Sequence, residues 1–362
     1  MRWHSLPLAA LVALALVPAT ARAYAPPGFI GISPQSVLAA TDFELMEEAG
    51  IRSVRLPLYW SAVQPRNPSL GKPDWSGFDQ DVRMAAEHGI AVFPDLYGTP
   101  AWAASEPSQE PVESAQQRWG WASFLRAAVA RYGSDGSFWE ENPELPFFPI
   151  RRWEIWNEEN IITFSYQPNP ARYVKLIRLS GRVLHEAEPG SQAIVGGLFG
   201  RPLHTPPNVG SGAFLARLYR TPGLTQDFDG VGLHPYVAHA SEIRGEIEEL
   251  RRIMLANHDP SMPIYVTELG WGSSNGPSRW QVGLYGQAEE LDQAFSMLTL
   301  NRQRWRIGGV WWFSWTNGGT CIFCGSAGLL TAHREAKPAW YQFNAWTDGD
   351  PEAVPRASFL SR

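Results

Sequence analysis

Two glutamates in distant parts of the chain have the residue type and the local setting that acid–base chemistry requires. Glu158 follows an apolar and aromatic run in WEIWNEEN, residues 153–160, and Glu268 lies in VTELGW, residues 266–271. Apolar runs of this length are typical of buried strands, so each carboxylate is expected where a strand ends. Two carboxylates facing each other over a short gap can cleave a glycosidic bond: one protonates the leaving oxygen, and the other attacks the anomeric carbon or activates a water.

Either glutamate taken alone could equally be a surface residue or one half of an ion pair. Their common position beside tryptophans at strand ends favours a joint role. Glu159 directly follows Glu158, and the surrounding sequence indicates no role for it. Glu154 has the same side-chain parity as Glu158 but lies deeper in the strand, so we expect a structural carboxylate paired with an arginine.

The rest of the chain alternates strand patterns with helical patterns. The expected strands cover residues 29–32, 51–58, 90–96, 150–157, 193–198, 228–233, 264–267 and 307–315. The expected helices cover residues 43–49, 78–88, 116–132, 173–187, 213–219, 243–254, 287–302 and 333–346. Such alternation predicts an α/β protein with a parallel sheet closed into a single-domain (β/α)8 TIM barrel. Strands four and seven of a barrel lie on roughly opposite sides, so both glutamates would point across one mouth.

Composition narrows the possible functions. The chain has 362 residues, of which 44% are hydrophobic and 18% charged, and its net charge is -6. No basic run could neutralise phosphates, so nucleic acid is not an expected partner. The 17 tryptophans suggest flat apolar faces on which sugar rings can lie. We find no metal-ligand spacing, phosphate-binding glycine loop or serine nucleophile elbow, and expect neither a metal nor a cofactor.

The N-terminal segment has the pattern of a secretory signal. An early arginine precedes the apolar run at residues 6–17, and a small-residue cleavage site ends at Ala23. This run is shorter than the ~20 residues that a membrane-spanning helix needs. We therefore expect a signal peptide over residues 1–23 and a catalytic domain over residues 24–362. The mature protein would be a secreted, periplasmic or cell-surface monomer without stable membrane insertion.

The two cysteines of the chain, Cys321 and Cys324, lie close together in a late loop. In an exported protein such a pair favours a disulfide that closes a very short loop. A thioredoxin-like redox pair is the alternative, but its usual setting is an early βαβ unit.

These motifs resemble clan A of the glycoside hydrolases, which are retaining β-glycosidases on (β/α)8 barrels. The segment WNE at residues 156–158 is similar to the clan signature that ends strand four, which implies that Glu158 is the general acid/base. The segment TELGW at residues 267–271 is similar to the strand-seven signature, which implies that Glu268 is the nucleophile. Many members have proline after the Asn-Glu pair, where this chain has Glu159.

Other segments extend the resemblance over nearly the whole mature chain. Arg55 matches an arginine that contacts the nucleophile region, and HPY at residues 234–236 matches a His-x-Tyr element. TPAW after strand three and KPAW in the last helix resemble the branch that contains β-xylosidases and α-L-iduronidases. The run WWFSW at residues 311–315 resembles the strand-eight tryptophan platform, and either Trp312 or Trp315 could fill that part.

The roles of the remaining candidates follow from their chemistry. A proton donor needs a raised pKa, which apolar surroundings and the charge of the second glutamate would provide for Glu158. Asn157 could bond the sugar 2-hydroxyl, and Tyr236 could orient the nucleophile. His234 could position the acid/base or bind sugar, or it could be a buried structural histidine. The candidates for sugar stacking in strand-end loops are Trp60, Trp102, Trp271, Trp280 and Trp315.

The sequence therefore predicts an exported retaining glycosidase that acts on a β-linked poly- or oligosaccharide through a covalent glycosyl–enzyme intermediate. A carbohydrate-binding barrel without catalysis is one alternative. A transglycosylase that uses the same residues is another.

Overall fold

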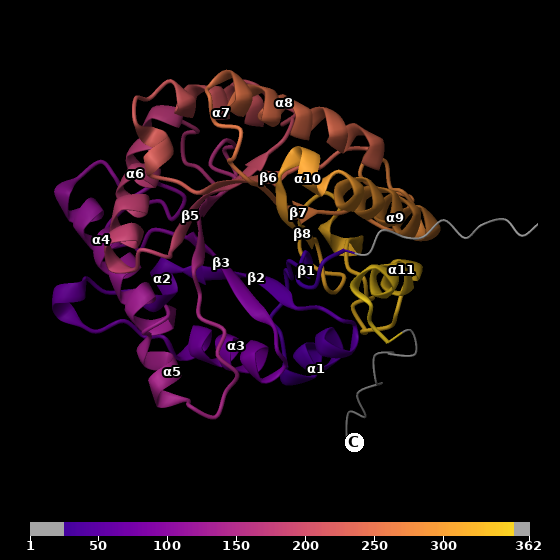
Figure 1. Cartoon of the computed structure of the whole chain (residues 1–362), viewed down its shortest axis with the longest axis horizontal. Helices are drawn as coiled ribbons and strands as arrows, with labels where there is room; N and C mark the ends of the chain where they lie inside the picture. Colours follow the sequence, from indigo (N-terminus) through magenta and orange to yellow (C-terminus); the bar gives the residue numbers. More distant parts are fainter. Residues whose placement is uncertain (1–24, 351–362) are drawn as a thin grey trace, which may run out of the picture.

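The computed structural model describes residues 25–350, which form a closed barrel of eight parallel strands in sequence order with helices around it (Figure 1). The (β/α)8 fold expected from the sequence is confirmed. The expected signal peptide, residues 1–23, lies outside the described part of the chain. The strands are β1 (Ile30–Ile32), β2 (Ser53–Tyr59), β3 (Ala91–Tyr97), β4 (Arg152–Asn157), β5 (Gln192–Phe199), β6 (Gly230–His234), β7 (Ile264–Leu269) and β8 (Ile307–Trp312).

Eight longer helices surround the strands, and shorter ones lie in the connecting loops. The longer helices are α1 (Ala40–Glu48), α3 (Ser76–Glu87), α4 (Ala115–Tyr132), α6 (Pro170–Ala187), α7 (Ser211–Tyr219), α8 (Ile243–Ala256), α9 (Leu284–Leu300) and α11 (Pro338–Thr347). The shorter ones include α2 (Trp60–Val63), α5 (Ser137–Glu141) and α10 (Arg302–Trp305). Among residues 25–350, no helix is long and apolar enough to span a bilayer.

Local side-chain contacts decide where the two longest helices begin. At α4, Ser114 Oγ accepts from the Gln117 N–H over 3.1 Å and Gln117 Oε1 accepts from the Ser114 N–H over 3.0 Å, which forms a capping box. At α6, Asn169 caps the helix and Pro170 takes its first position, where a missing N–H is harmless. Both helices therefore begin earlier than their apolar periodicity alone predicts.

Strand eight is shorter than the sequence indicates, since it ends at Trp312 and not at Trp315. Beyond it, the carbonyl of Trp315 accepts from the N–H of Leu330, so the chain pairs with a later loop segment instead of with β7. The last helix begins at Pro338 and not at His333. The residue before a proline is kept out of the helical region, so the helix cannot start earlier.

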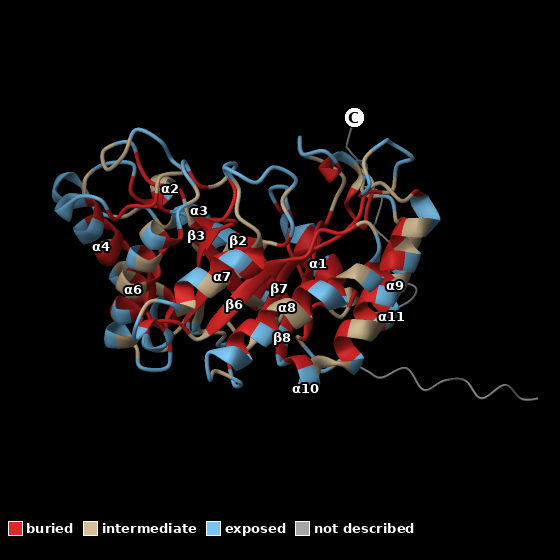
Figure 2. Cartoon of the chain, turned by 90° about the horizontal axis from the view of Figure 1, so that it is seen from above, coloured by how far each residue is buried: buried red, intermediate tan, exposed pale blue. Residues whose placement is uncertain are grey.

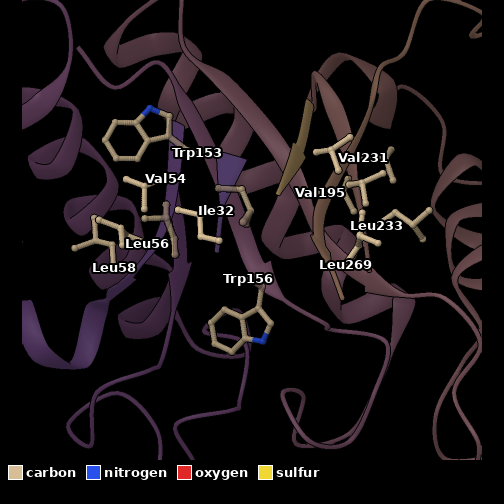
Figure 3. Close-up of a cluster of buried hydrophobic side chains, with 14 of the residues drawn as sticks. Ile32, Val54, Leu56, Leu58, Trp153, Trp156, Val195, Val231, Leu233 and Leu269 are labelled. Atoms are coloured by element: carbon tan, nitrogen blue, oxygen red, sulfur yellow. The ribbon is translucent and has the colours of Figure 1, made fainter. Parts of the chain in front are cut away.

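The core has two parts with different compositions. Between the strands and the helices lies an apolar layer, part of which Figure 3 shows from Ile32 of β1 to Leu269 of β7. Inside the barrel, an apolar floor is made by Phe93, Ile194, Tyr265 and Trp311. Above this floor, the interior becomes charged.

The two ends of the barrel differ in what covers them. Figure 2 shows α2, which follows β2, at one edge of the molecule and α10, which precedes β8, at the opposite edge. The long exposed loops gather at the edge of α2, where the carboxyl ends of the strands open. The charged part of the interior faces this end, which is where barrels of this type carry their sites.

Candidate active site

Glu158 and Glu268 come together at the carboxyl end of the barrel. Glu158 directly follows β4, and Glu268 is the fifth residue of β7. One carboxylate oxygen from each lies within 4.8 Å of the other, with His234 in the same group. Glu158 is 5% exposed and Glu268 is 9% exposed, so both are largely enclosed but reachable from the mouth.

The backbone around Glu158 explains how successive side chains reach this site. Trp156 has a backbone φ of 77° and Glu158 a φ of 44°. Residues other than glycine rarely adopt such positive values. The strand alternation breaks here, and the Trp156 ring turns away from the interior to pack on Trp121 of α4. Asn157 and Glu158 can then both face the mouth. Backbone conformations of this kind persist where the surrounding packing holds them, and they cluster at functional sites.

Arg55 of β2 links the parts of the site. Its Nη1 donates to Glu268 Oε1 over 2.6 Å, its Nη2 to Asn157 Oδ1 over 2.8 Å, and its Nε to Glu154 Oε2 over 2.5 Å. Asp95 of β3 adds a carboxylate 3.8 Å from Nη1. One guanidinium therefore compensates several buried carboxylates and fixes the direction of the Glu268 carboxylate. The expected pairing of Glu154 with an arginine is found.

Two donors favour the ionised form of Glu268. Burial raises the pKa of Glu268, while Arg55 and the hydroxyl of Tyr236, which donates to Oε2 over 2.6 Å, oppose that rise. Burial raises the pKa of Glu158 well above its ordinary value, and the charge of Glu268 adds to the rise. Glu158 has no direct bond to Arg55, so of the two it is the better candidate to keep a proton.

His234 lies between the carboxylates and is fully buried. Its Nδ1 is 2.7 Å from Glu158 Oε1 and 3.6 Å from Glu268 Oε2. Burial, together with the positive charge of Arg55, lowers the pKa of His234 well below its ordinary value, which favours the neutral ring. Of the roles considered from the sequence, contact with the Glu158 carboxyl is the one that this geometry favours.

Glu159 points away from Glu158 and out of the site. It is fully buried, and its Oε2 lies so near Gly196 of β5 that a Cβ there would be 2.4 Å from it. Burial raises the pKa of Glu159 well above its ordinary value, which favours the neutral carboxyl. This geometry favours Glu158 over Glu159 as the partner of Glu268.

Burial argues against sugar stacking for four of the candidate tryptophans, Trp60, Trp271, Trp312 and Trp315, which are at most 1% exposed, and Trp280 is only 6% exposed. Trp271 and Trp312 pack on each other at 6.0 Å between ring centres, on the helix side of the barrel. The Trp315 ring packs on α11, and its Nε1 donates to Asp42 over 2.9 Å. Trp102 stays half-buried and keeps some open surface.

The aromatic residues that surround the two glutamates are largely ones that the sequence did not single out. Tyr59, at the end of β2, is 47% exposed, and burial, Asp95 and Glu268 raise the pKa of its hydroxyl. Phe323 packs on Tyr236 at 5.1 Å between ring centres. Asp95 could have been recognised as a site residue from the sequence, because it is an acid in the otherwise apolar strand AVFPDLY.

Cys321 and Cys324 form the expected disulfide. It lies in the loop after β8 and brackets Phe323, which packs on Tyr236, Trp280 and Phe313. The disulfide therefore stiffens a wall of the site that contacts Glu268 only through Phe323 and Tyr236.

Glu158, His234 and Glu268 could together offer three ligand atoms to a metal ion. Two of these atoms, His234 Nδ1 and Glu158 Oε1, are 2.7 Å apart and bond to each other, and Arg55 lies 2.6 Å from Glu268. A guanidinium in contact with a would-be ligand opposes a second cation. The donor set therefore fits a hydrogen-bonded network better than a metal centre.

Comparison with solved structures yields several barrels of the same architecture. A family 39 glycoside hydrolase from Bacteroides cellulosilyticus WH2 is 22% identical with a TM-score of 0.67 over 90% of this chain and 64% of its own. A monomeric β-xylosidase from Caulobacter crescentus CB15 is 18% identical with a TM-score of 0.64 over 89% of this chain and 68% of its own. This chain has the fold of these glycoside hydrolases. The fold that the clan A resemblance implied is thereby confirmed.

A further match is the GH39 enzyme from Xanthomonas axonopodis pv. citri, 20% identical with a TM-score of 0.62 over 89% of this chain and 66% of its own. The chain spans about two thirds of the length of these solved proteins. No protein-family model and no curated protein matches the sequence. At such identities the likeness establishes the fold, and the activity has to be argued from the site.

Proposed function

We propose that this protein is a retaining glycosidase that hydrolyses O-glycosidic bonds of a β-linked oligo- or polysaccharide. The observation that carries the proposal is the Glu158–Glu268 pair, in which one oxygen of each carboxyl lies within 4.8 Å of the other. Retaining enzymes hold their carboxyl groups about 5–5.5 Å apart, whereas inverting enzymes need about 6.5–9.5 Å to admit a water. The short separation favours direct attack by a carboxylate.

In the first step, ionised Glu268 attacks the anomeric carbon and forms a glycosyl ester. The bond to the leaving oxygen breaks, and that oxygen takes the proton of Glu158. Arg55 and Tyr236 support this assignment, because their hydrogen bonds at 2.6 Å hold Glu268 in its charged form before attack.

In the second step, Glu158 is a carboxylate, because it has lost its proton and the charge of Glu268 is consumed in the ester. Glu158 accepts a proton from a water, the water oxygen attacks the anomeric carbon, and Glu268 leaves as a carboxylate. Asn157, fixed by Arg55 over 2.8 Å, is suited to bond the sugar 2-hydroxyl beside Glu158. Trp102 and Tyr59 offer partly exposed rings for the sugar.

We further propose that the mature protein is an exported monomer. The disulfide between Cys321 and Cys324 fits an oxidising compartment, and the expected signal segment is consistent with export. N-terminal sequencing of secreted protein tests the cleavage at Ala23, and light scattering tests the monomer.

The test of the activity is a pair of alanine variants assayed on a panel of aryl β-glycosides and β-linked oligosaccharides. Glu268→Ala should lose turnover, and azide should restore part of it with a product of inverted configuration. Glu158→Ala should keep activity on substrates with activated leaving groups and lose it on others, by roughly 10²–10⁴-fold. Glu246→Gln is a matched control, since this buried carboxyl lies on α8 outside the site.

Full activity of Glu268→Ala would refute the assignment. Binding of glycans without hydrolysis by the unmodified protein would instead favour a carbohydrate-binding barrel. Transfer of the sugar to an added alcohol in preference to water would favour a transglycosylase.

A further inference from the structure

A chain of hydrogen bonds leads from Glu158 down into the barrel. Glu158 Oε1 lies 2.7 Å from His234 Nδ1, and His234 Nε2 lies 3.1 Å from Thr267 Oγ1. Thr267 Oγ1 lies 2.8 Å from Glu154 Oε1, and Glu154 Oε2 accepts from Arg55 Nε over 2.5 Å. The catalytic step proposed above uses none of Thr267, Glu154 or the far side of the imidazole.

The protons along this chain can be placed by counting donors and acceptors. A neutral imidazole donates through one nitrogen and accepts through the other, and a hydroxyl donates one hydrogen bond. With Glu154 ionised, Thr267 donates to it and therefore accepts from the Nε2–H of His234. His234 Nδ1 is then an acceptor, and the group that donates to it is protonated Glu158.

The reverse arrangement uses the same atoms. The Glu158 proton passes to His234 Nδ1, the Nε2 proton passes to Thr267 Oγ1, and the Thr267 hydroxyl proton passes to Glu154 Oε1. The result is an ionised Glu158 and a neutral Glu154, with His234 and Thr267 unchanged in charge. One proton has crossed the interior, and no other reactant is required.

We propose that Thr267 and Glu154 are positioning residues which, through the tautomer of His234, determine whether Glu158 carries its proton. The inference rests on the proposed function, in which Glu158 must be protonated in one step and ionised in the next. We call the chain from Glu158 through His234 and Thr267 to Glu154 the relay. Arg55 connects its far end to the nucleophile, because its Nε donates to Glu154 and its Nη1 donates to Glu268.

The surroundings isolate the relay and bias its two ends. His234, Thr267 and Glu154 have no exposed surface. Burial raises the pKa of Glu154 to about 7, Arg55 from β2 opposes the rise, and Asp95 from β3 adds to it. Glu158 in turn faces Glu268 of β7, which also raises its pKa, so the two ends of the relay both titrate above the ordinary carboxyl range.

Glycines on the two neighbouring strands make room for the relay. A Cβ at Gly197 of β5 would lie 1.9 Å from His234 Nε2, and a Cβ at Gly232 of β6 would lie 2.7 Å from Glu154 Oε1. A side chain at either position would displace the imidazole or the carboxylate. Gly197 therefore permits a close approach of the imidazole to the β5 backbone.

The experiment compares Thr267→Val, Thr267→Ser and Glu154→Gln with the unmodified chain. ¹⁵N spectra of the imidazoles, with His234 assigned from His234→Gln, give the tautomer independently of turnover. We expect an Nε2–H tautomer in the unmodified chain and in Thr267→Ser. Glu154→Gln should switch to Nδ1–H because its amide donates to Thr267, and Thr267→Val should switch because Nε2–H would have no acceptor.

The same variants are assayed for the pH dependence of kcat/KM on an aryl β-glycoside. In Glu154→Gln and Thr267→Val, the Nδ1–H group favours ionised Glu158, so the basic limb should move to lower pH by about one unit, a tenfold change in the equilibrium. Thr267→Ser should keep the original limb. Thr299→Val is the matched control, because it also removes a fully buried hydroxyl, on α9.

Two outcomes separate the relay from the activity. An unchanged tautomer and basic limb in both Thr267→Val and Glu154→Gln, with Thr267→Ser folded and active, would overturn the relay and leave the glycosidase intact. A tautomer switch in a protein that hydrolyses no β-glycoside would support the hydrogen-bonded chain and overturn the proposed function.

Discussion

The hydroxyl of Tyr236 donates to Oε2 of Glu268 over 2.6 Å, while Arg55 holds the other oxygen of the same carboxylate. Each oxygen of the candidate nucleophile therefore has its own donor. The direction of attack and the charge of Glu268 depend on both.

Tyr236→Phe removes one of these donors without changing the ring. A hydrogen bond to a charged group contributes about 1.5–3 kcal/mol, so kcat/KM should fall by roughly 10–100-fold. The Tyr236 hydroxyl lowers the pKa of Glu268, and its loss should move the acid limb of the pH profile to higher pH. A profile with an unmoved acid limb would contradict a direct role of the hydroxyl.

The unmodified chain should have a bell-shaped dependence of kcat/KM on pH. Below the pKa of Glu268 the nucleophile is protonated, and above the pKa of Glu158 the proton donor is lost. Burial raises both pKa values, so the whole bell should lie at higher pH than that of two ordinary carboxyls. Assays from about pH 4 to about pH 9 test this, and an activity maximum near the acid end would contradict it.

Arg55→Met leaves the carboxylates of Glu154, Glu268 and Asp95 without their cation. Breaking a buried ion pair on one side destabilises by roughly 3–5 kcal/mol. Without the guanidinium, the pKa of these carboxyls in the folded state rises further above the unfolded values. The unfolded chain is the same for both proteins, so the stability deficit should grow as pH rises through the folded-state pKa values of the unmodified chain, about 7 for Glu154, and shrink as pH falls.

Urea unfolding of Arg55→Met at about pH 5 and about pH 8 measures that deficit. Arg83→Met is the control, since its pairing with Glu144 is exposed and contributes at most about 1 kcal/mol. A deficit that is equal at both pH values would argue against an electrostatic cause.

Reduction of the Cys321–Cys324 disulfide should change activity more than thermal stability. The cysteines are three positions apart, so the bridge closes a very short loop and restricts the unfolded chain little. It holds Phe323 against Tyr236, which contacts Glu268, so a looser loop should lower kcat/KM. A double serine variant tests the same point without reductant, and a large fall in Tm with unchanged activity would contradict it.

Glu159→Gln should be close to neutral for both stability and activity. Burial favours the neutral form of the Glu159 carboxyl, and an amide of the same shape preserves the packing against Gly196. Glu159→Ala leaves a cavity in the same place and should destabilise by a few kcal/mol, roughly 2–3. Loss of turnover in Glu159→Gln, with the fold intact, would reopen the choice between Glu158 and Glu159.

The positions of Glu158 and Glu268 were predictable because barrel strands end at one mouth, so a carboxylate at each strand end meets the other. The partners of Arg55 were predictable in part, since a lone arginine in an apolar strand needs carboxylates. The burial of Trp312 and Trp315 was not, because it depends on where strand eight stops pairing with β7.

The link from His234 to Glu154 was also beyond the sequence. Thr267 precedes the candidate nucleophile and has the appearance of an ordinary strand threonine. Its hydroxyl joins two residues from other strands, and that contact depends on the register of β4, β6 and β7 around the barrel. Strand patterns give the parity of a side chain but not the height at which neighbouring strands align.

Gly197 and Gly232 have a consequence for how this protein could acquire new specificities. At these positions, β5 and β6 contribute no side-chain atoms to the interior. The imidazole of His234 and the carboxylate of Glu154 fill that space. In a saturation-mutagenesis library, every substitution at either glycine should be lost, however small the new residue. Variation in sugar preference would then have to come from the loops at the mouth, while the charged residues of the barrel interior stay unchanged.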